Sequence, residues 1–129
     1  MLIDDYFTAI LQLVEDHPSV ESHTLRFEKR TEHTGYIRRE LVFRDAKVLH
    51  IREFVDLDAP FPRLLYAYQF MSPADTMLFR YDNSGHHKGV DTFPHHKHVA
   101  GDKAIEASSA PTLKAVLDEV DLFMDFKAF

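Results

Sequence analysis

The chain has 129 residues, of which 45% are hydrophobic and 28% charged; this composition is typical of a globular protein and argues against a disordered chain. The net charge of −6 argues against broad, nonspecific binding to nucleic acid but leaves room for a local basic site. No cysteine is present, which excludes disulfides, thiolate metal ligands and cysteine nucleophiles.

The length is that of one domain, so we expect residues 1–129 to form a single unit with one hydrophobic core. The N-terminal segment carries Asp4 and Asp5 in place of a basic targeting region. No apolar run is long enough to cross a bilayer. We therefore expect a cytoplasmic protein with no membrane-spanning segment.

Residues 3–16 predict the first helix, because apolar side chains recur there at three- and four-residue spacing until the sequence His17-Pro18-Ser19 ends the pattern. From about residue 23 the period changes to two, which is typical of strands. The alternating positions lie in 25–28, 37–43, 48–55, 64–70 and 77–81, and turn sequences such as 32–35 and 72–75 separate them. Short connections favour antiparallel pairing between neighbours.

A second helix is expected near the C-terminus, with Ser109 and Pro111 as its N-cap and first-turn proline and Leu113, Val116, Val120 and Phe123 on one face. The fold class is then α+β, an antiparallel meander sheet of about five or six strands flanked by an N-terminal and a C-terminal helix. The tail after Leu122 is apolar, and we expect Phe123 to pack in the core and Phe126 and Phe129 to contact a partner.

One face of this sheet is expected to be strongly polar. Its ordinary interpretation is a solvated face with cross-strand pairs between arginine and glutamate. Its functional interpretation is a floor that binds anions or stacks on bases. The residues assigned to that floor are Arg38, Arg52, Tyr66, Tyr68 and Arg80, on a face that also includes Arg26, Glu28, Glu40 and His50.

The segment from Arg80 to Val99 holds five of the nine histidines, and we expect it to be the functional centre. Imidazole titrates near pH ~6.5, so a pair of histidines can take and give protons during cleavage of a phosphodiester, provided that they lie on opposite sides of the phosphate. Nearby cations can stabilise the developing charge. In this hypothesis His96 and His98 are the acid and base, and Arg80 and Lys97 are the cations.

The same residues also allow a metal site. If residues 96–98 form a strand, His96 and His98 point to one face and can both bind zinc or another divalent metal, with His86, Asp82 or Asp91 as a third ligand. A purely structural interpretation fits parts of the segment: Asn83 can shape the turn at 82–85, and Phe93 and Pro94 can anchor the returning chain, with Phe93 in the core. Packing alone explains five clustered imidazoles poorly.

The segment resembles the TumE-type toxins of prokaryotic toxin–antitoxin modules. The resemblance rests on Arg80-Tyr81-Asp82-Asn83, on His86-His87 and on Thr92-Phe93-Pro94-His95-His96-Lys97-His98, although Ser84-Gly85 stands where members often have Ala-Pro. It implies a growth-inhibiting toxin, often regarded as a ribonuclease, that acts on RNA in the cytoplasm and pairs with an antitoxin carrying a helix-turn-helix domain.

Our leading expectation is therefore a small toxin with metal-independent endoribonuclease activity and no cofactor. Its catalytic residues would be His96, His98, Arg80, Lys97, His86, His87 and Asp82, and its substrate-binding residues Arg38, Arg52, Tyr66, Tyr68, Tyr81, Asn83 and His95. The alternatives are a hydrolase or nuclease whose metal is bound by His86, His96 and His98, and a noncatalytic module that inhibits by binding. A homodimer is compatible with all three.

Overall fold

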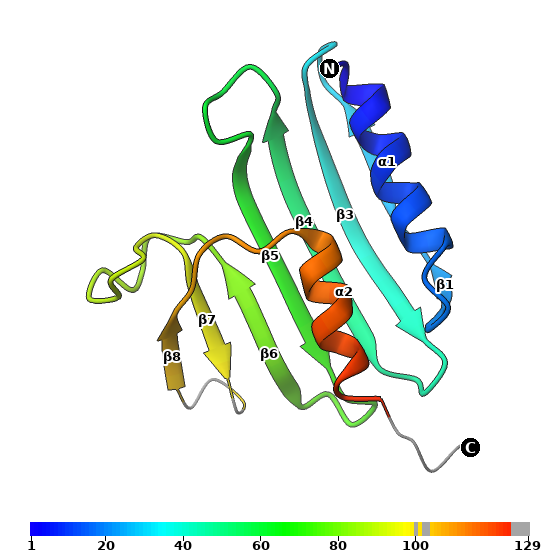
Figure 1. Ribbon diagram of the computed structural model, residues 1–129, viewed down its shortest axis with the longest axis vertical. Coiled ribbons are helices and arrows are strands. Elements are labelled where there is room, and N and C mark those ends of the chain that lie inside the picture. Colours follow the sequence, from blue (N-terminus) through cyan, green and yellow to red (C-terminus); the bar gives the residue numbers. More distant parts are fainter. Residues whose placement is uncertain (100, 102–103, 125–129) are drawn as a thin grey trace.

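A computed structural model describes residues 1–99, 101 and 104–124. Eight strands form one antiparallel sheet, and two helices lie on the same face of it (Figure 1). The α+β prediction is confirmed. The elements are α1 (Ile3–Glu15), β1 (Val20–His23), β2 (Arg26–Lys29), β3 (Thr34–Phe43), β4 (Val48–Asp56), β5 (Arg63–Met71), β6 (Met77–Asp82), β7 (His96–Val99), β8 (Ala104–Ala107) and α2 (Leu113–Asp121).

The sheet follows the chain as a meander from β3 to β8, with β1 and β2 both paired to β3. The prediction of five or six strands was slightly low because β1, β7 and β8 are only four residues long and lack a clear apolar alternation. The long strands β3, β4 and β5 bury every second side chain over most of their length, which is the pattern that the sequence shows.

The core lies between the sheet and the two helices. Helix α1 buries Ile3, Phe7, Ile10 and Val14, the spacing that predicted it, and it ends at Glu15, before Pro18. Within the described part of the chain, no helix is long and apolar enough to cross a bilayer. We call the sheet face under α1 and α2 the covered face and the opposite one the open face.

Helix α2 begins later than the sequence indicates. Its N-cap is Thr112, whose hydroxyl accepts a hydrogen bond from the backbone N–H of Ala115, so the assignment of Ser109 and Pro111 to the cap and first turn was wrong. Threonine satisfies an orphan N–H at a helix start as serine does, and the shift is one helical turn. Phe123 contacts Phe70 and Phe79 but is 37% exposed, so it lies at the margin of the core and not inside it as expected. Phe126 and Phe129 lie outside the described residues.

Gly35 allows α1 to approach β3 closely. A Cβ atom at this position would lie 2.6 Å from the ring of Phe7 and 2.8 Å from the backbone oxygen of Glu28, and the backbone cannot move aside cheaply. We expect Gly35→Ala to lower the free energy of unfolding by about 1–3 kcal/mol, measured by urea denaturation. Gly89→Ala is the control, since no atom lies within 4 Å of its Cβ; equal losses in both variants would contradict this account.

Candidate functional site

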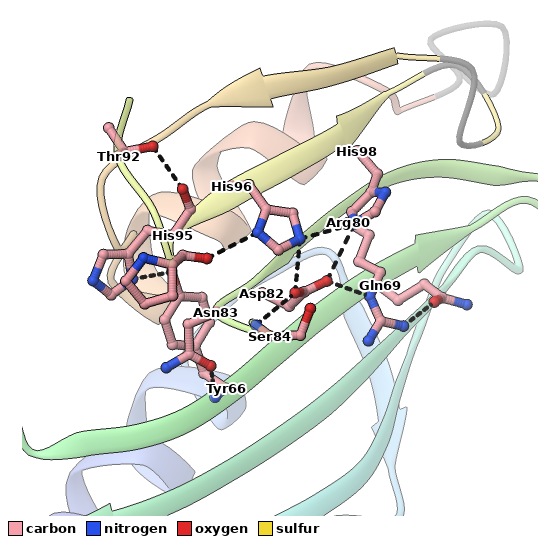
Figure 2. A network of polar contacts seen from close by, with 11 residues as sticks. Tyr66, Gln69, Arg80, Asp82, Asn83, Ser84, Thr92, His95, His96 and His98 are labelled. Carbon is pink, nitrogen blue, oxygen red and sulfur yellow. Dashed lines mark hydrogen bonds and ion pairs between the residues drawn. The ribbon is translucent and has the colours of Figure 1, made fainter. Parts of the chain in front are cut away.

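A compact polar cluster joins β6 and β7 at the open face, and its members are Arg80, Asp82, His96 and His98 (Figure 2). The antiparallel register sets Asp82 opposite His96 and Arg80 opposite His98. Directly opposed residues point to the same face, so two short strands are enough to bring the four side chains together. We call this set, with His87 added below, the histidine cluster.

Asp82 is the acceptor at the centre of the cluster. Its Oδ2 accepts a hydrogen bond of 2.8 Å from Arg80 Nε, and its Oδ1 lies 2.9 Å from His96 Nε2 and accepts from the backbone N–H of Ser84 at 3.0 Å. Burial raises the pKa of Asp82, but the hydrogen bonds from Arg80 and Ser84 outweigh burial, so this pKa is lowered. Asp82 is therefore an ionised carboxylate that is only 3% exposed.

The two strand imidazoles face each other. His96 Nδ1 lies 2.9 Å from the carbonyl oxygen of Pro94, and because a carbonyl only accepts, Nδ1 carries the proton. The Nε2 of His96 then points at Asp82 and, at 3.1 Å, at Nε2 of His98. The ring of His87 packs edge-on against both, with centroids 4.8 Å from His96 and 5.2 Å from His98.

This arrangement overturns one part of the acid–base hypothesis. A pair that takes and gives protons across a scissile phosphate must leave room for that phosphate, but the Nε2 atoms of His96 and His98 are 3.1 Å apart. The two residues are also only 1% and 8% exposed, so the two rings form one buried unit. His96 and His98 cannot flank a phosphate as separate acid and base.

A groove lined mainly by arginines continues from the cluster across β5, β4 and β3 on the open face. It has a volume of about 390 Å³, and Arg38, Arg39, Arg52 and Arg80 contribute its cations; the remaining lining residues are His50, Ile51, Ala67 and Gln69. Gln69 Oε1 accepts a hydrogen bond of 2.7 Å from Arg80, which therefore belongs to both the cluster and the groove. We call this feature the arginine groove.

Arg39 enters the groove only because its backbone is unusual. Alternation along β3 buries Ile37 and Leu41, so position 39 would face the core with them. Its φ of 104° lies in the region that side chains rarely adopt, and the side chain is exposed and lines the groove beside Arg38. Three consecutive charged residues at 38–40 interrupt the alternation in the sequence. This interruption indicates an irregular strand, but it does not identify Arg39 as a residue of the groove.

The comparisons with known proteins agree with the resemblance at the histidine segment. A family model described as toxin TumE matches residues 10–124. The chain belongs to the TumE toxin family. The matched range contains the whole sheet, helix α2, the histidine cluster and the arginine groove. No significant match is found among curated proteins or among solved structures.

Four residues assigned to the site of this TumE-family chain lie on the covered face instead, and Lys97 and Tyr81 are the first two. Lys97 alternates with His96 and His98 along β7, so its ammonium points the other way and lies 2.6 Å from Glu119 in α2. The hydroxyl of Tyr81 also donates to Glu119. Burial lowers the pKa of Lys97, but Glu119 outweighs it and the pKa is raised, as for a cation in an ion pair. Lys97 and Tyr81 fix α2 to the sheet.

The expectation that Tyr66 and Tyr68 share a face with Arg38 and Arg52 was wrong. Both tyrosines are buried on the covered face, because β5 pairs Tyr66 with Glu53 and Tyr68 with Ile51, whereas Ala67 is the residue opposite Arg52. Tyr68 donates a hydrogen bond of 2.6 Å to the carboxylate of Glu53, which is 1% exposed. Tyr6 of α1 donates to the second oxygen of Glu53, so the network ties α1 to the sheet.

These tyrosines give the fold a sensitivity to high pH. Burial, followed by the charge of Glu53, raises the pKa of both Tyr6 and Tyr68 above the ordinary value of 10.0. Their contribution to stability is complete below pH 10 and is lost as pH rises toward the folded-state pKa, at up to about 1.4 kcal/mol per pH unit for each group. We expect urea unfolding between pH 9 and pH 11 to show this loss, and Tyr68→Phe to show a shallower one. An unchanged slope in Tyr68→Phe, relative to a Tyr36→Phe control, would contradict it.

Of the remaining residues of the segment, some hold the loop in place and others lie outside the cluster. Asn83 accepts from the backbone N–H of Tyr66 at 3.0 Å and donates to the carbonyl of Leu64 at 3.1 Å, so both ends of its amide tether the loop to β5. His95 Nδ1 lies 2.9 Å from the hydroxyl of Tyr66, and burial, then Arg63 and His96, lowers the pKa of this imidazole. His86 is exposed and outside the cluster, and Phe93, expected in the core, is 43% exposed.

Proposed function

We propose that this toxin inhibits growth as an endoribonuclease, with RNA lying along the arginine groove and the phosphodiester cleaved beside the histidine cluster. The observation that carries the proposal is the position of Arg80. Its Nε is hydrogen-bonded to the central carboxylate of the cluster, while its Nη1 donates to Gln69 and the residue lines a groove with three further arginines. One residue thereby connects a polyanion-binding surface with a group of imidazoles.

The charge distribution supports an RNA substrate. The chain as a whole is acidic, with a net charge of −6, whereas the arginine groove collects four guanidinium groups. Arginines bind phosphate oxygens in a planar, two-pronged geometry, and such contacts supply most of the affinity for a nucleic-acid backbone. The acidic remainder limits binding elsewhere on the surface. A cytoplasmic location belongs to the same proposal.

In this proposal the groups divide the work by position. Arg80 stabilises negative charge on the phosphate, and Arg38 and Arg52 bind the RNA backbone. His98 and His87 provide the imidazoles at the end of the groove. His96 and Asp82 contact His98 and hold its ring in position. A family of toxins also implies a cognate antitoxin, for which we propose a protein with a helix-turn-helix domain.

The test combines toxicity with cleavage. We expect the purified chain to cut RNA oligonucleotides, and expect Arg80→Ala and His98→Asn to lose at least about a hundredfold in rate and to lose toxicity when expressed without an antitoxin. His33→Asn is the matched control, since His33 lies in the β2–β3 connection and contacts Met1 and Asp58. Toxicity that persists in both site variants, with no RNA cleavage by the parent, would favour inhibition by binding alone.

A further inference from the structure

We infer that the histidine cluster is a binding site for a divalent transition metal of the zinc class, with His87, His96 and His98 as ligands and Asp82 as the adjacent counter-charge. The inference concerns the same place as the proposed ribonuclease activity, but it rests on the geometry of the donors and not on that activity. His87 and not His86, the sequence-based choice, is the third imidazole, since ring nitrogens of His87, His96 and His98 lie within 4.8 Å of one another.

The separations between donors match those of a metal site. Ligands at 2.0–2.1 Å from a tetrahedral zinc ion lie about 3.3 Å from each other. In the cluster, Nε2 of His96 and Nε2 of His98 are 3.1 Å apart, and the carboxylate oxygens of Asp82 lie 2.9 and 3.4 Å from them. The separation between the His96 and His98 nitrogens is thus already close to one edge of a coordination tetrahedron, and His87 adds a third imidazole from the adjoining loop, within 4.8 Å of the other two.

The contact between His96 and Asp82 needs a positive charge. The proton of His96 sits on Nδ1, where it is given to the carbonyl of Pro94, so in the neutral ring Nε2 presents a lone pair to an ionised carboxylate and to a second imidazole. The lone pair of Nε2 and the carboxylate oxygen of Asp82, 2.9 Å apart, repel each other unless a proton or a metal ion lies between them. Either added protons or a metal ion can supply it, and the two are distinguished by experiment.

The surroundings are those of metal-binding histidines in general. An imidazole ligand commonly donates its other N–H to a carbonyl, as His96 does to Pro94, and such a contact fixes both the tautomer and the ring orientation. Asp82 is in turn held by Arg80 and by the N–H of Ser84. Three imidazoles also leave a fourth coordination position, which is the pattern of a site that binds water or substrate.

His86 and His87 provide a matched pair for the test, because they are neighbours on the same loop and only His87 belongs to the cluster. The full chain is purified without chelators and without a polyhistidine tag, and bound metal is measured by mass spectrometry and by titration with zinc and cobalt. We expect one ion per chain, a higher thermal midpoint with zinc, and visible absorption of tetrahedral cobalt. We expect His87→Asn to bind at least about tenfold more weakly and His86→Asn to bind as the parent does.

Absence of bound metal, with no shift of the thermal midpoint on adding zinc or cobalt, would overturn the inference and leave shared protons as the occupant. Equal weakening in His86→Asn and His87→Asn would overturn it as well. RNA cleavage is measured on the same samples with and without EDTA. Stoichiometric metal without RNA cleavage would keep the metal site and remove the ribonuclease proposal. Cleavage by a protein that binds no metal would keep the ribonuclease proposal and remove the metal site.

Discussion

Replacing Arg39 with glycine should make the protein more stable and weaken its binding of RNA. A non-glycine residue at a φ of 104° costs about 1–3 kcal/mol, because its Cβ crowds the backbone, and glycine removes that crowding. The gain is reduced by the greater freedom of glycine in the unfolded chain, so we expect a net increase of about 1 kcal/mol in the free energy of unfolding. The same change deletes one of the four cations of the arginine groove.

The measurement is the affinity for a single-stranded RNA at several salt concentrations. Loss of one phosphate contact should weaken binding across all sequences and reduce the slope of log affinity against log salt by about one. Arg39→Lys keeps both the charge and the strained backbone, so it should retain the parental stability and most of the salt slope. Arg44→Ala, at the β3–β4 turn outside the groove, controls for the net charge. A variant that gains stability and binds RNA unchanged would show that Arg39 serves no RNA contact.

Changing Asp82 to asparagine should nearly abolish activity while leaving the fold in place. Asparagine has the same shape and can still accept from the N–H of Ser84, but it removes the negative charge beside Arg80 and the imidazoles. The loss of that charge leaves a guanidinium and the cluster without their counter-charge in a buried place. We expect RNA cleavage to fall by about a hundredfold or more and the free energy of unfolding by about 1–3 kcal/mol.

The cleavage rate and the urea midpoint of Asp82→Asn are compared with those of Asp91→Asn. Asp91 is an exposed acid in the same loop, so its replacement controls for a change of one charge near the site. Circular dichroism of both variants establishes that the sheet has formed. If Asp82→Asn cleaves RNA at a rate close to the parental one, the carboxylate is structural and the role assigned to the cluster is incorrect.

Long periodic segments made most of the fold predictable. Helix α1 and strands β3, β4 and β5 each contain enough residues for a period of 3.6 or 2 to be recognised. The strands β7 and β8 have four residues each, and β7 reads His-Lys-His-Val, so its pairing depends on neighbours that a local pattern does not reveal.

The site was predictable as a set of residue types but not as a geometry. Clustering in the sequence identified His87, His96, His98, Arg80 and Asp82, which the structure brings together. It could not assign Lys97 to the other face without knowing that residues 96–99 form a strand. Tyr66 and Tyr68 were misplaced because a tyrosine fits either face: its hydroxyl can reach water or, as here, a buried partner such as Glu53.

The two faces of β7 connect parts of the molecule that do not touch. His96 and His98 lie in the cluster, while the residue between them is bound to Glu119 of α2, so the strand is fixed from both sides at once. A displacement of α2 from the sheet would break the ion pair between Lys97 and Glu119 and leave β7 held from the cluster side alone.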